Sequence, residues 1–217
     1  MQADDRRLAE TIASLVRDAA PVRTLARPVV RAGRWLAGAA LLAPGAVVLL
    51  RVRQDIAVQW EQLPFVGFAA VLAALTVVSA ASALLLSVPG AGRSPLTRLV
   101  PAVVAAIWGG VLAWQVWQGI QPWHAGWAHP VHATCSFRMT VIGLLPGVAL
   151  FAMMRAAAPL DHRWAAMCAG LAAVGLGALG TQFVCADDTA LHLMAWHFAP
   201  GMALVAILGS FGRRALR

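Results

Sequence analysis

Six long apolar runs constrain the fold of this chain more than any other feature of its sequence. Each is close to the roughly 20 residues that an α-helix needs to cross the hydrocarbon core of a bilayer. Of the 217 residues, 60% are hydrophobic and only 12% are charged, whereas about a quarter of a soluble domain is charged. The sequence therefore predicts an all-α polytopic membrane protein with six transmembrane helices, at about 32–50, 63–88, 99–118, 139–156, 164–184 and 190–211.

The arginines predict how these helices are oriented. All 17 basic residues are arginines, and fourteen of them lie in the N-terminal tail, the second loop, the fourth loop and the C-terminal tail. The first and third loops together carry the other three. Because arginine is enriched in the short cytoplasmic loops of membrane proteins, we expect both termini in the cytoplasm. The third loop and the short fifth loop are then expected on the outer side of the membrane.

The N-terminal tail contains a predicted amphipathic helix over residues 4–19. Its apolar residues recur at helical spacing and form one stripe, and Pro21 ends the pattern. Acids and arginines mix on the polar face, which suits a groove on a protein partner better than a lipid surface, the alternative. The chain is therefore divided into a cytoplasmic partner-binding segment, 1–31, and a six-helix membrane domain, 32–217. The stripe consists of Leu8, Ile12, Leu15 and Val16.

The three cysteines are expected to differ in role. Cys135 and Cys185 fall in outward loops on this topology, whereas Cys168 lies near the cytoplasmic end of the fifth span. Roughly 25 Å of helix separates Cys168 from Cys185, which is far beyond disulfide reach. Cys168 is therefore expected to be a small packing residue. An oxidising compartment permits a disulfide between the other two, and two thiolates suit a soft metal ion equally well.

Histidines and an acid close to these cysteines extend the metal hypothesis. Two histidines precede Cys135 at a spacing of three, and a third lies one turn into the sixth span, after Cys185. Thiolate and imidazole ligands together suit copper(I) or zinc, and thiolates also suit cadmium. The alternative is that these histidines are ordinary polar residues at a membrane interface. The candidate metal ligands are Cys135, Cys185, His129, His132, His192 and Asp187.

A further histidine lies within the sixth span. His197, beside Trp196, is about 10 Å into that span by helical rise. An ionisable residue inside a membrane is a functional candidate by default, and the alternative is a structural histidine bonded to its neighbours. From sidedness alone, we also expect Arg138 to pair with Asp187 or Asp188.

The order of these features resembles the NrsF-type family of bacterial inner-membrane anti-sigma factors over nearly the full chain. The matching pieces are the six spans and three stretches, LAETIASLVRDAAPVRTLARPVVRAGRWLA, ATCSFRM and CADDTALHLMAWHFAPGMALVAILGSFGRRAL. The resemblance implies a protein that holds an extracytoplasmic-function (ECF) sigma factor through its cytoplasmic N-terminal segment. It also implies that a periplasmic oxidant or heavy metal, such as copper, cadmium or chromate, releases the sigma factor.

By this resemblance, Cys135 and Cys185 match the sensor cysteines, and the stripe at residues 8–16 falls in the sigma-binding segment. A soft metal ion would be a signal rather than a resident cofactor, and neither enzymatic activity nor direct nucleic-acid contact is expected. The alternatives are a quinone-linked membrane thiol oxidoreductase and a transporter of metal or small molecules. The first usually needs a Cys-x-x-Cys motif or two cysteine pairs. The second usually needs ionisable groups at mid-span, for which His197 is the sole candidate.

Overall fold

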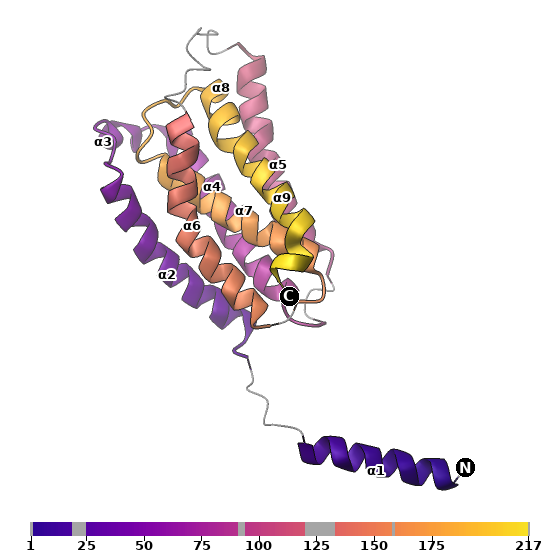
Figure 1. Ribbon diagram of the computed structural model, residues 1–217. Coiled ribbons are helices and arrows are strands. Elements are labelled where there is room, and N and C mark those ends of the chain that lie inside the picture. The colour runs from indigo at the N-terminus through magenta and orange to yellow at the C-terminus, as the bar shows by residue number, and fades with distance from the viewer. Residues whose placement is uncertain (1, 19–24, 91–93, 120–132, 158, 217) are drawn as a thin grey trace.

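The computed structural model describes residues 2–18, 25–90, 94–119, 133–157 and 159–216, and within these ranges it is helical with no strand (Figure 1). Two helices precede or connect the long spans, α1 (Gln2–Asp18) and α3 (Ile56–Gln59). The long helices are α2 (Pro28–Leu49), α4 (Leu63–Leu86), α5 (Leu96–Trp117), α6 (Ala133–Arg155) and α7 (His162–Thr181). The last span is a composite of α8 (Ala190–Leu193), the π-helix η2 (Met194–Phe198) and α9 (Ala199–Ala215).

The six spans of the sequence analysis are confirmed. Five long helices and the composite segment Ala190–Gly212 are long and apolar enough to cross a membrane. The largest difference is at α6, which begins at Ala133, six residues before the predicted start. The expected boundary followed Arg138, but the helix continues through it. The Arg138 guanidinium donates instead to the carbonyl of Val184, 3.1 Å away, so the charge lies at the end of the bundle while the backbone stays helical.

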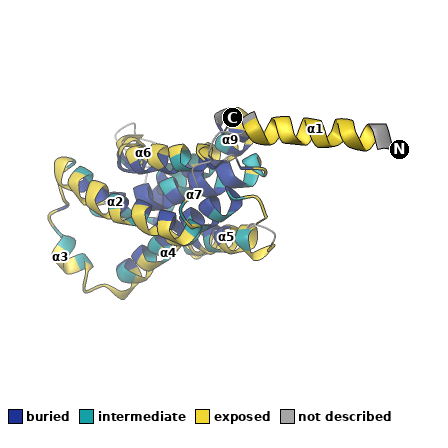
Figure 2. Cartoon of the chain, turned by 90° about the horizontal axis from the view of Figure 1, so that it is seen from below, coloured by how far each residue is buried: buried dark blue, intermediate teal, exposed yellow. Residues whose placement is uncertain are grey.

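Helix α7 forms the centre of the bundle, and Figure 2 shows it as the most buried helix, with exposed faces on the surrounding ones. Small residues allow this packing. A Cβ added at Gly143 of α6 would lie 2.5 Å from the carbonyl oxygen of Ala173, and Gly177 of α7 faces the backbone of Met139. Ala173 and Gly177, four residues apart on α7, therefore make the close contact with α6.

This packing predicts a large difference between two glycine-to-alanine substitutions. Gly143→Ala is expected to lower the thermal unfolding temperature of the detergent-solubilised protein, because the new methyl group meets backbone that cannot move aside. Such overpacking costs about 1–3 kcal/mol. Gly67→Ala in α4 is the matched control, since nothing lies within 4 Å of its added Cβ. Equal unfolding temperatures for the two variants would contradict the α6–α7 contact.

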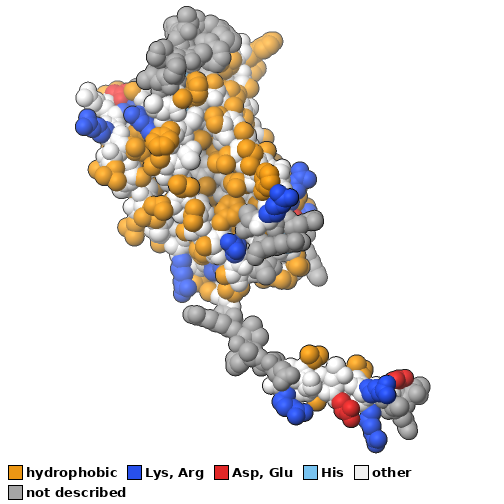
Figure 3. Space-filling view, in the orientation of Figure 1, with side chains coloured by type: hydrophobic (Ala, Val, Ile, Leu, Met, Phe, Trp, Pro, Cys, Tyr) orange, Lys and Arg blue, Asp and Glu red, His pale blue; other side chains and the backbone are white. Residues whose placement is uncertain are grey.

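The two ends of the bundle differ in composition. The end where α2 begins and α9 finishes is called here the terminal end, and the opposite end, with α3 and α8, is the cysteine end (Figure 1). Figure 3 shows hydrophobic side chains over the middle and arginines towards both ends. Among the described residues, the cysteine end carries Arg51, Arg53 and Arg138, and the terminal end carries Arg27, Arg31, Arg34, Arg98, Arg155, Arg163 and Arg214.

Helix α1 confirms the predicted amphipathic helix and is drawn apart from the bundle in Figure 1. Each of the four stripe residues is more than half exposed: Leu8, Ile12, Leu15 and Val16. The bundle therefore leaves the apolar face of α1 uncovered.

Candidate functional site

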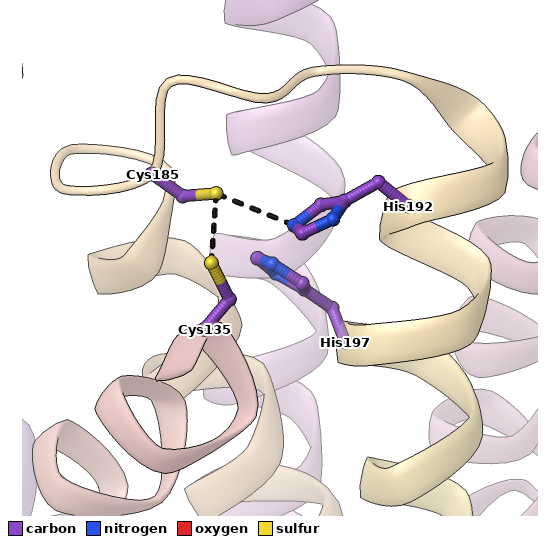
Figure 4. Close-up of side chains that lie close together, drawn as sticks. All are labelled: Cys135, Cys185, His192 and His197. Atoms are coloured by element: carbon purple, nitrogen blue, oxygen red, sulfur yellow. Dashed lines mark hydrogen bonds between the residues drawn. The ribbon is translucent and has the colours of Figure 1, made fainter. Parts of the chain in front are cut away.

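Four side chains from three separate segments meet at the cysteine end. They are Cys135 in the first turn of α6, Cys185 in the loop after α7, His192 in α8 and His197 in η2 (Figure 4). One sulfur or ring nitrogen from each lies within 4.8 Å of those of all the others, and all four residues are buried. The two sulfurs are 3.1 Å apart, and Cys185 Sγ is 3.4 Å from His192 Nε2. This group is called the Cys–His cluster below.

Local hydrogen bonds start α8 at the position that brings His192 to the cysteines. The carboxylate of Asp187 accepts the backbone N–H of Thr189 at 3.0 Å, a turn in which a side chain replaces a backbone acceptor. The hydroxyl of Thr189 then accepts the N–H of His192 at 3.4 Å, which is the usual N-terminal cap of a helix. The loop sequence therefore determines where the helix begins and which way His192 points.

The π-helical turn brings His197 to the same side as His192. Pro200 has no N–H to give the carbonyl of Trp196, and its ring would collide with that carbonyl in a regular helix. The chain widens instead, and Ala199 donates to the carbonyl of Met194, five residues back. In an α-helix, residues five apart point about 140° away from one another, whereas this wider turn stacks them on one face.

The carbonyl of Trp196, to which Pro200 cannot donate, accepts a hydrogen bond from the hydroxyl of Ser136. Ser136 is the neighbour of Cys135, so this bond ties α6 to η2 directly beside the cluster. Trp196 itself is half-buried. In the sequence, Trp196 and His197 stand apart from the cysteines, and the structure brings them to the same end of the bundle.

A buried arginine holds the loop that carries Cys185. Arg53 donates two hydrogen bonds to Asp188, at 2.8 and 2.7 Å, and others to Asp55. Its backbone N–H also donates to the carbonyl of Phe183 at 2.8 Å. Hydrogen bonds to Asp55 and then Asp188 raise the pKa of Arg53, and the guanidinium in turn lowers the pKa of Asp55. The first loop is therefore clamped onto the loop after α7.

This clamp corrects one expectation. Asp188, offered as a partner for Arg138, is bound by Arg53, because the loop after α2 folds across the end of α7. From the sequence alone, Arg53 enters only the count of charges on each side of the membrane. The signal that could have found it is the Arg-x-Asp pair formed with Asp55 on the side of the membrane where charged residues are few.

The remaining candidates have varied placements. Asp187 lies behind His192, its carboxylate 3.4 Å from Nδ1, rather than among the four clustered groups. Cys135 lies in a helical turn, not in a loop. Cys168 is buried in α7 near the terminal end, as expected of a packing residue. The candidate ligands His129 and His132 lie outside the described residues.

Two kinds of chemistry fit the cluster. Sulfurs 3.1 Å apart need move only about 1 Å to form a disulfide bond. The same two sulfurs, with two ring nitrogens, also match the donor set of a soft metal ion. The pKa of the Cys185 thiol is raised by its hydrogen bond with Cys135 and by burial, so at rest this sulfur favours the protonated form.

Fold and cluster together define a class of protein, a polytopic α-helical membrane protein with a buried thiol–imidazole cluster at one end of its bundle. An exposed amphipathic helix precedes the first membrane-spanning helix in the chain. Residues 15–217 match the family described as NrsF, negative regulator of sigma F. The match spans nearly the whole chain, and the chain belongs to this family. A negative regulator of this kind has a sigma factor as its partner. No curated protein and no solved structure matches the chain.

Proposed function

We propose that this chain is an anti-sigma factor of the bacterial inner membrane that sequesters an ECF sigma factor at its cytoplasmic face. A periplasmic oxidant or heavy metal acts on Cys135 and Cys185 and releases the sigma factor. One observation carries the sensor part of the proposal: the two sulfurs, fifty residues apart in sequence, lie 3.1 Å apart in a buried cluster. Membership in the NrsF family is the basis for a sigma factor as the partner.

The distribution of arginine supports the sidedness. In the sequence, fourteen of the 17 arginines lie in the two tails and in the second and fourth loops, and three lie in the first and third loops. Among the described residues of the bundle, the first group lies at the terminal end and the second at the cysteine end. By the positive-inside rule the terminal end is cytoplasmic and the cysteine end periplasmic. The cluster then lies near the compartment in which oxidants and metal ions reach the cell first, and α1 lies on the side where sigma factors act.

The exposed stripe on α1 supports a sigma-binding role for the N-terminal segment. An apolar helical face that the bundle leaves exposed favours burial in a hydrophobic groove of a partner. Leu15 and Val16 lie inside the region that matches the family, and Leu8 and Ile12 precede it. The segment 1–31 is therefore proposed as the sigma-binding unit, and 32–217 as the sensor domain.

Two hydrogen bonds from α2 to α6 offer a route by which a structural change at the cysteines can reach the cytoplasmic N-terminal segment. Arg31, buried at the start of α2, donates to the carbonyl of Met153 at the end of α6 and to the hydroxyl of Ser87, 3.2 Å away. One turn further, the Trp35 indole N–H donates to the carbonyl of Pro146 at 2.7 Å. Because Cys135 begins α6, a displacement of α6 reaches the residue at which the N-terminal segment joins the bundle.

Replacing Arg31 therefore tests the route. Arg31→Gln is expected to reduce signal-induced transcription from a sigma-dependent reporter by about fivefold or more, the scale of a typical coupling free energy. Labelling of the two sensor thiols by a periplasmic reagent should remain normal. Arg34→Gln is the matched control, since Arg34 lies on the same helix but is exposed. A wild-type response from Arg31→Gln would exclude this route.

The family is one of regulators, and we propose no enzymatic activity for the chain. A thiol oxidoreductase would need a second reactive cysteine pair, but the third cysteine, Cys168, is buried near the opposite end of the bundle.

The proposed function is tested by co-purification of the full-length protein with an ECF sigma factor of the same organism. The sigma factor should be retained in detergent extracts of untreated cells and lost after cadmium or a thiol oxidant is added. Absence of any sigma factor from untreated extracts would contradict the proposal.

A further inference from the structure

We infer that Cys135, Cys185, His192 and His197 form one four-coordinate site for a divalent thiophilic ion of the zinc and cadmium class. The regulatory meaning of the site rests on the proposed function, whereas ion binding itself rests on the geometry of the four groups. The joint ligand set with His197 is the new element, since the sensor assignment concerns only the two cysteines and the sequence offers only His192 of these two histidines as a candidate ligand.

The distances suit a single ion. Zinc–sulfur and zinc–nitrogen bonds of about 2.3 and 2.0 Å in a tetrahedron place the ligand atoms roughly 3.3–3.8 Å from one another. The Cys185 sulfur is 3.4 Å from His192 Nε2, and the two sulfurs are 3.1 Å apart. No pair among the four ligand atoms exceeds 4.8 Å, so movements of about 1 Å complete the coordination shell.

The ring of His197 supplies a second, independent observation. The side chain is 2% exposed, and its Nε2 has no hydrogen-bond partner among the described residues. A buried polar atom without a partner is destabilising, and a metal ion at the centre of the cluster would supply the missing partner. Figure 4 shows both histidine rings directed towards the two sulfurs.

The surroundings of His192 also fit a metal ligand. Its Nδ1 lies 3.4 Å from the carboxylate of Asp187, while Nε2 faces the Cys185 sulfur. A carboxylate behind the outer ring nitrogen is the usual support of a metal-binding histidine, since it orients the ring. Asp187, a candidate ligand in the sequence, thus acts through His192.

Charge decides between monovalent and divalent ions. Binding releases the protons of both thiols, because thiolates are the ligands. Two thiolates and a divalent ion leave the buried cluster neutral, whereas a monovalent ion leaves one uncompensated negative charge in a site of low polarity. Two sulfur and two nitrogen donors in a tetrahedron are also the donor set typical of zinc.

The experiment uses the full-length protein in detergent, freed of metal by a chelator and titrated with Co²⁺ as a spectroscopic probe, then with Zn²⁺ or Cd²⁺ in competition. We expect one ion per chain and the intense visible absorption of tetrahedral, thiolate-bound cobalt. His192→Gln and His197→Gln should each weaken binding by roughly tenfold or more. Cys168→Ala and His162→Gln are matched controls that should bind as the wild type does.

His197→Cys keeps a ligand at the same position and guards against misfolding of the glutamine variants. It should retain one tetrahedral Co²⁺ per chain, with stronger sulfur-to-metal absorption than the wild type. Loss of binding in this variant, despite wild-type thermal unfolding of its metal-free form, would overturn the inference.

Two other results would overturn it as well. One is wild-type Co²⁺ affinity in both glutamine variants, and the other is tight binding of Cu⁺ alone that is insensitive to both histidines. Neither result touches the sensor role of the cysteines. That role fails by a different readout, namely a reporter that still responds when both cysteines are replaced.

Discussion

Cells carrying the double variant Cys135→Ser and Cys185→Ser are expected to show no induction of a sigma-dependent reporter under cadmium or oxidant stress. The ratio of induced to uninduced transcription should fall to about one. Serine removes the two groups that form a disulfide or bind a soft ion, while it keeps nearly the same size. The uninduced level should stay low, because α1 and the terminal end of the bundle are unchanged.

The strength of this expectation comes from the position of the two sulfurs. A signal shifts an equilibrium between two states only if it binds or modifies one state more favourably than the other. Cys135 and Cys185 are the groups on which an oxidant or a soft metal ion is proposed to act, so this difference is expected to arise there. Any linkage between them joins the start of α6 to the loop before α8. Single serine variants should lose most of the response too, since a bridge needs both partners.

Cys168→Ser is the control, since it changes a thiol that is buried near the opposite end of the bundle. Its response should match the wild type once protein levels are equalised. Normal induction in the Cys135 and Cys185 double variant would refute the sensor assignment, whichever chemistry the cluster supports.

Most of the fold follows from the sequence because membrane spans are determined by length and hydrophobicity, which are local properties. The error at the start of α6 has a physical cause. Arg138 suggested a loop, but a long side chain reaches a carbonyl at the end of the bundle while its own backbone remains helical.

The site was predictable only in part. Sidedness alone placed Cys135 and Cys185 at the same end of the bundle. His197 is a functional candidate in the sequence but stands apart from the cysteines there, because five residues separate it from His192, a spacing that α-helical geometry excludes from one face. The turn that unites them depends on Pro200 and on the Ser136 hydroxyl, which donates a hydrogen bond to the carbonyl of Trp196, and the second of these is a tertiary contact. Arg53 was missed for a similar reason, since Asp188 is 135 residues away.

The double variant Ile12→Asp and Leu15→Asp is expected to release the sigma factor permanently. Burial of one large aliphatic side chain contributes about 1.5–3 kcal/mol. Loss of two therefore weakens binding by about 3–6 kcal/mol, a factor on the order of one hundred or more. Reporter transcription without any signal should rise to the level of a strain that lacks the protein, and the sigma factor should no longer co-purify.

Ala13→Asp with Ser14→Asp is the matched control, because the same two acids then lie on the polar face of α1. That variant should repress as the wild type does, which separates loss of the apolar stripe from added charge or lower helix propensity. If α1 instead docks on lipid, the stripe variant would leave sigma-factor retention intact and change only the membrane association of the tail. Because Leu15 lies within the family match and Ile12 precedes it, the two single variants also show how much of the binding energy lies in each part of the helix.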